Sequence, residues 1–366
     1  MLVPFIDFKR EWKFFEKEMM QTFRAFGRSG YYVLGPEVEK FEKDFAQFCG
    51  YKYAVGVSTG LSALEMILRA YKIGEGDEVI TVANSAVATS LAISHLGAKP
   101  IFCDIGEDYL MDVSCIEKCI TKKTKAILPV HLFGKICDMK RINLIAKKHK
   151  LVVIEDACQA HGAKCQKDSA VNTKAFSFYP TKNLGAFGEG GAVVTQDASV
   201  RDFVASYRNY GQRERYTHVI KGENGRIDTL QCMLMGVKLK HLKAFTQKRT
   251  QMAKKYLNAF RNISQLRIPA FDETSAHHLF VIRVQGGLRD PLKKFLKEKG
   301  VDALVHYPTP IHKQPCYQDE YKNVILAQTD KFQDEILSLP CHPFLTDAER
   351  TQVISCVKEF FSKKFV

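Results

Sequence analysis

The chain has 366 residues, enough for one large domain and a smaller one, each with its own core. Its hydrophobic fraction of 46% and charged fraction of 26% are those of a soluble globular protein, and no apolar run is long enough to cross a membrane. The net charge of +14 invites a nucleic-acid hypothesis, but the lysines are spread over many segments rather than gathered in a basic stripe. A solvated surface that attracts anionic, phosphate-bearing substrates explains this charge without nucleic acid.

The cysteines and the N-terminus both favour a cytoplasmic setting. The eleven cysteines are scattered without a Cys-x-x-Cys pair, which argues against a zinc site or any other metal centre. Residues 1–7 lack a charged region followed by an apolar one, so we expect no signal peptide. We therefore expect the cysteines to be reduced thiols.

Short β-rich runs alternate with helical ones through the first half of the chain. Apolar residues at three- and four-residue spacing predict a helix over 9–27, and Pro36 begins a second helix that ends near Cys49. Strands are then expected at 53–57, 78–82, 100–103, 126–130, 151–154, 175–178 and 191–195, with helices at 60–72, 85–96 and 138–149. This alternation indicates an α/β fold with a mostly parallel sheet flanked by helices, whose active site lies at the carboxyl ends of the strands.

The last third of the chain predicts a smaller C-terminal α/β domain. A long helix is expected over 228–260, followed by strands at 278–284 and 301–306 and helices at 288–299 and 346–363. We therefore expect a large domain over 1–245 and a small one over 246–366.

Two of the apolar runs lead to residues that suit pyridoxal 5'-phosphate. The run 151–154 is followed by Asp156, and the run 175–178 by Lys182. A lysine can hold this aldehyde cofactor as a Schiff base and then shuttle the substrate proton, and a carboxylate can keep its pyridine nitrogen protonated. Gln159 could hydrogen-bond to the hydroxyl side of the ring. Either Lys182 or Asp156 alone would suggest only a solvated surface residue, but together they predict a cofactor site.

The segment 55–64 offers a cradle for the cofactor phosphate. It runs from a strand through small residues into a helix that begins near Gly60 and Leu61, whose free backbone amides suit a dianion. Ser177, on the strand leading to Lys182, is a second donor. Many α/β loops have this composition for packing reasons, so the segment predicts a phosphate site only in combination with Lys182.

Taken together, these segments resemble the DegT/DnrJ/StrS family of sugar-nucleotide aminotransferases over almost the whole chain. The segments that carry the resemblance are Glu-Asp-Ala-x-Gln-Ala-His-Gly-Ala at 155–163, Ser-Phe-Tyr-Pro-x-Lys-Asn-Leu-Gly at 177–185, and the shorter motifs at 190–193, 209–211, 222–228 and 307–315. The resemblance implies the aspartate aminotransferase fold (fold type I), a homodimer with shared active sites, and glutamate as the amino donor. It also implies that Asn224 reaches the cofactor phosphate of the neighbouring subunit.

The finer pattern is most similar to members that aminate carbon 3 of a dTDP-linked 3-keto-6-deoxyhexose. Members that act on carbon 4 more often have a Gly-Thr cradle and lack the histidine matching His161. The resemblance places these residues near the sugar or its pyrophosphate: Tyr179, His161, Arg226, Tyr307 and His312. A packed histidine at His161, and ordered turns around Tyr307 and His312, are the alternatives.

One position departs from the family pattern. Where members commonly place an aromatic residue that stacks on the pyridine ring, this chain has Ala86. An aromatic stack contributes on the order of 1 kcal/mol, so we expect weaker cofactor binding with intact chemistry.

Three other functions compete with carbon-3 amination. Amination at carbon 4, or of a UDP- or GDP-linked sugar, would use the same residues. A dehydratase of this fold would have histidine in place of Lys182. A non-catalytic regulator would fit the charge but not the joint presence of Lys182, Asp156 and Asn224. The expected product, a 6-deoxy amino sugar, would serve a surface glycan such as lipopolysaccharide or an S-layer chain, or an antibiotic.

Overall fold

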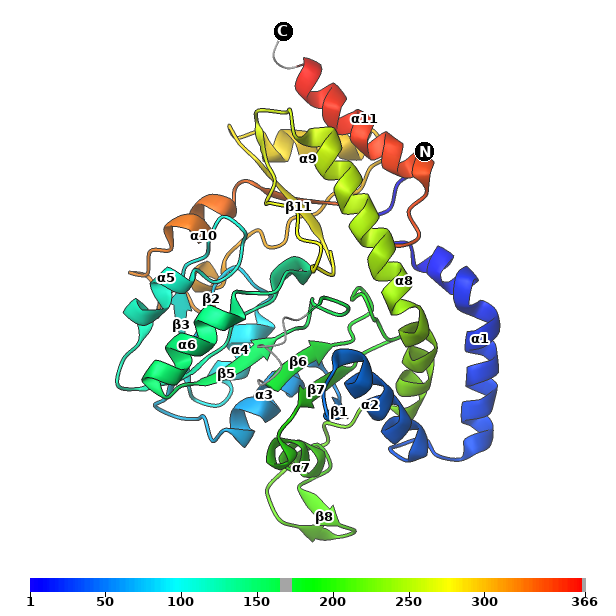
Figure 1. Cartoon of the computed structure of the whole chain (residues 1–366), viewed down its shortest axis with the longest axis vertical. Coiled ribbons are helices and arrows are strands. Elements are labelled where there is room, and N and C mark those ends of the chain that lie inside the picture. Colours follow the sequence, from blue (N-terminus) through cyan, green and yellow to red (C-terminus); the bar gives the residue numbers. More distant parts are fainter. Residues whose placement is uncertain (165–172, 364–366) are drawn as a thin grey trace.

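The computed structural model describes residues 1–164 and 173–363. Its larger part is built around a seven-stranded sheet with the strand order β1-β7-β6-β5-β4-β2-β3 (Figure 1). Strand β7 is antiparallel to both neighbours, and the other neighbouring strands are parallel, which confirms the predicted α/β class. The strands are β1 (Tyr53–Val57), β2 (Glu78–Val82), β3 (Lys99–Cys103), β4 (Thr124–Ile127), β5 (Val152–Asp156), β6 (Thr173–Ser177) and β7 (Gly191–Thr195).

Helices cover both faces of this sheet, because side chains alternate between the faces along each strand. The helices of this part are α1 (Phe8–Ser29), α2 (Pro36–Cys49), α3 (Gly60–Ala70), α4 (Ala88–Ser94), α5 (Val113–Ile116), α6 (Met139–His149), α7 (Ala198–Tyr207) and α8 (Thr229–Phe260). In β7, Val193 packs in a core with α3, whereas Val194 packs in a separate core with α2 and α8. Helix α1 lies outside α8, where its Phe15 and Met19 are buried against it.

Local sequence signals account for where several helices begin and end. Helix α2 has Pro36 in its first turn and ends at Gly50, whose φ of 74° is left-handed and suits glycine. Helix α6 begins after Asp138, whose carboxylate accepts a hydrogen bond from the Arg141 amide at 3.1 Å.

The C-terminal part has its own antiparallel sheet and its own core. Its elements are β10 (Leu266–Arg267), β11 (Phe280–Val284), β12 (Ile336–Leu339), α9 (Arg289–Glu298), α10 (Ala327–Phe332) and α11 (Asp347–Lys363). Figure 1 shows α8 running from the large sheet into this part, where Met252 and Tyr256 join the second core. The boundary expected near residue 245 therefore lies inside a continuous helix, and the division into domains there stays a prediction.

Some expected elements differ from the structure. The segment 301–306 is not a strand: Val301 bridges to Val3 and Leu304 to Ser338, so it alternates between two partners instead of forming a ladder. Strand β11 lies between β10 and β12, and neither of these two strands was expected. The short hairpin of β8 (Gln212–Glu214) and β9 (Thr217–His218), which projects below α7 in Figure 1, was also not expected. In the described part of the chain, none of the helices combines the length and apolarity needed to cross a membrane.

Candidate active site

The strands bring the predicted cofactor residues to one edge of the sheet. Strand pairing sets Val57 opposite Gly191 and Gly191 opposite Ser177, so β1 and β6 end level with each other on either side of β7. Strand β5, the parallel neighbour of β6, ends at Asp156. The carboxyl ends of the parallel strands thus gather the carboxylate, the Ser177 hydroxyl and the turn that contains Lys182, as expected for an α/β sheet.

Asp156 is held from two sides. It is only 4% exposed. Its Oδ2 accepts a hydrogen bond from Thr89 Oγ1 at 2.8 Å, and its Oδ1 accepts one from the Cys158 amide at 3.1 Å. A buried carboxylate needs such donors, because desolvation without them is costly. The arrangement leaves the remaining oxygen lone pairs available to a donor such as a pyridinium N–H.

Lys182 is half-buried in the turn that follows β6. Burial lowers the pKa of Lys182 below the ordinary lysine value, while the Cys158 thiol and the Asp156 carboxylate act in the opposite direction. A lowered pKa makes the neutral, nucleophilic amine more abundant. Lys182 lines a cavity of about 120 Å³ with residues of the C-terminal part: Arg249, His278, Leu304, His306, Tyr307 and Cys341.

The start of α3 forms a cradle that fits a phosphate group. Thr59 caps the helix by accepting a hydrogen bond from the Ser62 amide at 2.9 Å, so the first amides, those of Gly60 and Leu61, have no helical carbonyl to bind. A Cβ atom at Gly60 would lie 2.6 Å from Cβ of Ser177, so only glycine lets the helix start approach this strand. The Ser177 Oγ accepts a hydrogen bond from the Tyr179 amide at 3.2 Å, which leaves its own proton to donate. Two amides and a hydroxyl thus suit a dianion.

Gln159 connects three segments beside Asp156. Its Oε1 accepts a hydrogen bond from the Phe133 amide at 2.8 Å, and its Nε2 donates to the Tyr307 hydroxyl at 3.2 Å. Burial, and secondarily the charge of Asp156, raise the pKa of Tyr307 to about 12, so its hydroxyl keeps its proton. The structure therefore brings Gln159 and Tyr307 together, and one Nε2 hydrogen of Gln159 remains for a ligand.

The two predicted substrate histidines lie in different surroundings. His161 is 1% exposed, and its ring packs against Phe176 and Phe178 with centroid separations of 5.1 and 5.8 Å. Neither of its ring nitrogens makes a hydrogen bond of full geometry with a described residue. Burial lowers the pKa of His161 to about 3, and the nearby backbone of Ser177 opposes this only weakly. His312 is also buried, with Nε2 lying 3.1 Å from Asp330 Oδ1. Both rings are packed, and their contact with substrate stays a prediction.

Three other predicted residues lie outside the Lys182 cavity in the described part of the chain. Tyr179 is 48% exposed. Asn224 bridges to Asn209, whose Oδ1 accepts a hydrogen bond from Arg226 Nη1 at 2.8 Å. Arg226 in turn bridges to Val57 at the end of β1, so the segment 224–226 lies next to the cradle.

The position of Ala86 is at the start of α4. Its carbonyl accepts a hydrogen bond from the Thr89 amide at 3.1 Å, and the next residue, Val87, is 39% exposed. The methyl group offers no ring for stacking, and weaker cofactor binding as its consequence stays a prediction.

Several residues at this edge of the sheet were not singled out from the sequence. Thr89 contacts Asp156 from a helix 67 residues away in the chain, which no local pattern signals. Asn183, next to Lys182, donates through Nδ2 to the Ala276 carbonyl at 3.0 Å, and its Oδ1 lies 3.2 Å from His278 Nδ1. Only its place in the 177–185 motif could have suggested that it fixes the lysine turn to the C-terminal part.

Glu155, which precedes Asp156 on β5, is part of a buried charge network. Glu155 Oε2 lies 2.6 Å from His131 Nε2 and 2.7 Å from Lys174 Nζ. Burial alone would raise the pKa of Glu155, but the hydrogen bond with His131 and the charge of Lys174 outweigh it and hold the pKa below its usual value. The network satisfies the charges on these strands without reaching the Lys182 cavity.

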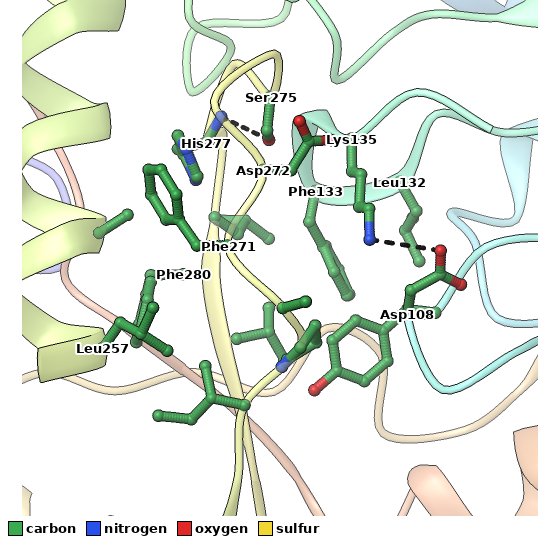
Figure 2. Close-up of a pocket in the computed structure, with 17 residues that line it drawn as sticks. Asp108, Leu132, Phe133, Lys135, Leu257, Phe271, Asp272, Ser275, His277 and Phe280 are labelled. Carbon is green, nitrogen blue, oxygen red and sulfur yellow. Dashed lines mark hydrogen bonds and ion pairs between the residues drawn. The ribbon is translucent and has the colours of Figure 1, made fainter. Parts of the chain in front are cut away.

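Figure 2 shows a second cavity, of about 70 Å³, whose lining does not include Lys182. It separates the 132–135 loop from Leu257 of α8 and the segment before β11. Its lining is mostly apolar, with Phe133 and Phe271 on opposite sides and an ion pair of 3.3 Å between Lys135 and Asp108 at its margin. It contains none of the predicted cofactor residues, so it is not the candidate active site.

Comparisons with known proteins agree with this geometry. Residues 14–358 match the sequence profile of the DegT/DnrJ/EryC1/StrS aminotransferase family. The chain is 40% identical to dTDP-3-amino-3,4,6-trideoxy-alpha-D-glucose transaminase from Streptomyces venezuelae, over 98% of this chain and 96% of that protein. It is 41% identical to dTDP-3-amino-3,6-dideoxy-alpha-D-galactopyranose transaminase from Aneurinibacillus thermoaerophilus, over 98% and 99%. The crystal structure of NtdA from Bacillus subtilis with bound cofactor PMP superposes with a TM-score of 0.94 at 32% identity, covering 99% of this chain and 86% of that one.

Proposed function

The chain belongs to the DegT/DnrJ/EryC1/StrS aminotransferase family, and we propose that it converts a dTDP-linked 3-keto-6-deoxyhexose into the dTDP-3-amino-3,6-dideoxyhexose. Glutamate is the amino donor and pyridoxal 5'-phosphate the cofactor. The observation that carries this proposal is the convergence of Asp156, Lys182 and the Gly60–Ser177 cradle at one edge of the sheet. The substrate class follows the two transaminases described above, which are both named for dTDP-linked 3-amino sugars.

Each part of the cofactor has a matching group in the chain. When bound, pyridoxal phosphate supplies an aldehyde that takes up the amino group and a ring that withdraws electrons from the reacting carbon. Asp156 would hold the ring nitrogen, and Gln159 the hydroxyl side of the ring. The amides of Gly60 and Leu61 and the Ser177 hydroxyl would hold the phosphate, and Asn224 would complete the phosphate site of the neighbouring subunit.

Lys182 has two tasks. It would hold the cofactor through Nζ, and after release from it the same amine would move the proton at the reacting carbon. Its lowered pKa suits both tasks, because each requires a neutral amine. Tyr307 keeps its proton, is bound by Gln159 and lines the same cavity, and it would donate a hydrogen bond to the sugar. Tyr179, His161, Arg226 and His312 complete the proposed substrate contacts.

A homodimer is part of the proposal. Large apolar side chains are exposed on α1 and on the loop that follows it: Phe14, Met20, Phe23, Tyr31, Tyr32 and Val33. An exposed apolar patch of this kind indicates a protein interface, and a second copy of the same chain is the usual partner. We place the enzyme in the cytoplasm, in keeping with the free buried thiols of Cys103, Cys137 and Cys232. The amino sugar would enter a surface glycan such as lipopolysaccharide.

The visible absorption spectrum with pyridoxal phosphate, before and after glutamate, tests the proposal. Wild-type protein should gain a yellow band that glutamate bleaches, and a keto-sugar substrate should restore it. Lys182→Ala should bind the cofactor without the lysine-dependent band and without turnover, and Lys182→Arg should behave alike. NMR spectroscopy of the product then distinguishes amination at carbon 3 from amination at carbon 4. No band, or substantial turnover by Lys182→Ala, would contradict the proposal.

A further inference from the structure

The contact between Thr89 and Asp156 joins two distant elements at the candidate site. Thr89 lies in the first turn of α4, after β2, whereas Asp156 ends β5, and β4 lies between these strands in the sheet. Both side chains are buried, with exposed fractions of 1% and 4%, and the oxygen atoms are 2.8 Å apart. The contact is therefore shielded from water. In such a buried environment a hydrogen bond to a carboxylate is strong and geometrically well defined.

The directions of the hydrogen bonds follow from the chemistry of the groups. A carboxylate has no proton to give, so Thr89 must donate its single hydroxyl proton to Asp156 Oδ2. The Thr89 oxygen can then accept a proton from Ser85 Oγ, which lies 3.1 Å away. On the other side, the Cys158 amide donates to Asp156 Oδ1 at 3.1 Å. The two oxygens of the carboxylate are thus each held by one donor, from opposite ends of the group.

The Thr89 side chain is not needed to cap its own helix. The residue at the N-cap of α4 is Val87, which makes no side-chain cap, and the Thr89 amide already donates to the Ala86 carbonyl. Ser90, the next residue, is fully buried on the same helix, and its hydroxyl has no hydrogen-bond partner in the part of the chain that is described. Burial on α4 alone therefore does not bring a hydroxyl into contact with Asp156, because Ser90 is buried there and makes no such contact, whereas Thr89 does.

We propose that Thr89 is a positioning residue for Asp156, which orients the carboxylate so that a free oxygen lone pair faces the ring nitrogen of the cofactor. The terminal torsion of an aspartate is broad and roughly two-fold, so a single donor at the Cys158 amide leaves the carboxylate free to rotate. The Thr89 hydroxyl removes this freedom. The inference rests on the proposed function, since it concerns how the same site holds pyridoxal phosphate.

The test compares three variants of the cofactor-loaded protein. Thr89→Val removes the hydroxyl at nearly constant volume, and Thr89→Ser keeps it. Ser90→Ala removes a neighbouring hydroxyl that has no partner among the described residues. The first readout is the pH midpoint of the visible band. A proton that Asp156 keeps on the ring nitrogen disfavours a second proton on the nitrogen that joins the cofactor to Lys182. If the carboxylate is no longer oriented, it holds the ring proton less well, and the second nitrogen binds its proton more tightly. Thr89→Val should therefore move the midpoint up by roughly one pH unit.

The second readout separates positioning from general stability. Thr89→Val should slow bleaching by glutamate about tenfold with little change in KM for glutamate, because the residue does not contact the donor. Thr89→Ser and Ser90→Ala should match wild type in both readouts. A Thr89→Val protein that melts earlier but keeps the wild-type midpoint and rate would overturn the inference, as would Ser90→Ala shifting the midpoint equally. Absence of a band in wild type would instead overturn the proposed function, and the role of Thr89 with it.

Discussion

Burial controls the protonation of the groups around Lys182. The pKa of the lysine is lowered from the ordinary value of 10.5, chiefly because its charged form loses solvation. The fraction of neutral amine rises as the pH passes through the pKa, so a lowered pKa moves this rise to lower pH. The rate at which cofactor-free protein forms the yellow band should therefore increase with pH around a midpoint below 10.5. Stopped-flow absorbance across the pH range measures this, and a midpoint at or above the free-lysine value would refute it.

His161 provides a second prediction at the scale of one residue. Buried polar atoms usually have partners, and neither ring nitrogen of His161 makes a full hydrogen bond with a described residue, which supports the predicted role as a substrate ligand. His161→Phe keeps the ring packing against Phe176 but removes both nitrogens. We expect it to raise KM for the keto-sugar about tenfold and to leave bleaching by glutamate unchanged.

The control for this experiment is a buried histidine elsewhere in the chain. His277 stacks on Phe271 with a centroid separation of 5.3 Å, outside the Lys182 cavity, and its Nε2 also has no partner among the described residues. His277→Phe should leave both parameters unchanged. If His161→Phe also leaves KM unchanged, the packed alternative for His161 is correct.

At the scale of elements, the cradle depends on how closely α3 approaches β6. An alanine Cβ at position 60 would lie 2.6 Å from Cβ of Ser177 and 3.0 Å from Sγ of Cys158, so the helix start must move away. Gly60→Ala should therefore weaken cofactor binding at least tenfold, because the amides and the Ser177 hydroxyl no longer converge. Titration of the yellow band measures this affinity. In the control Gly236→Ala, within α8, the added Cβ meets no atom within 4 Å, and helix stability should rise by about 1 kcal/mol with unchanged affinity. Equal cofactor affinity in the two variants would argue against the cradle.

The features of this structure that could be predicted are those set by short stretches of the sequence. The places of Asp156 and Lys182 in the fold could be predicted because each follows an apolar run that forms a buried strand with a definite carboxyl end. The contact of Thr89 with Asp156 and that of Gln159 with Tyr307 could not, since they join residues 67 and 148 positions apart. The segment 301–306 was wrongly expected to be a strand because its apolar residues serve two single bridges rather than one ladder. Local pattern predicts elements, whereas register and partners depend on the assembled fold.

At the scale of the whole molecule, the surface of α1 bears on the assembly. Phe23 on this helix is 54% exposed, and Ile325, in the C-terminal part, is 84% exposed. If α1 contributes to a homodimer, Phe23→Glu should produce monomers in multi-angle light scattering and lose most activity, because the proposed sites are shared between subunits. Ile325→Glu should remain dimeric and active. A wild-type monomer, or a fully active monomeric Phe23→Glu protein, would exclude a shared site.

Subunit mixing tests the sharing directly. In the proposed dimer each site uses Lys182 of one subunit and Asn224 of the other. Lys182→Ala and Asn224→Ala homodimers should each be impaired, since every site in them lacks one group. In a mixed dimer both losses fall in the same site, and the other site has its own Lys182 and the unchanged Asn224 of the Lys182→Ala subunit. Turnover should therefore reappear when the two proteins are co-refolded or co-expressed, up to one intact site per mixed dimer. If instead Asn224 acts within its own subunit, beside the cradle where the segment 224–226 meets β1, every mixed site retains one loss and no activity returns.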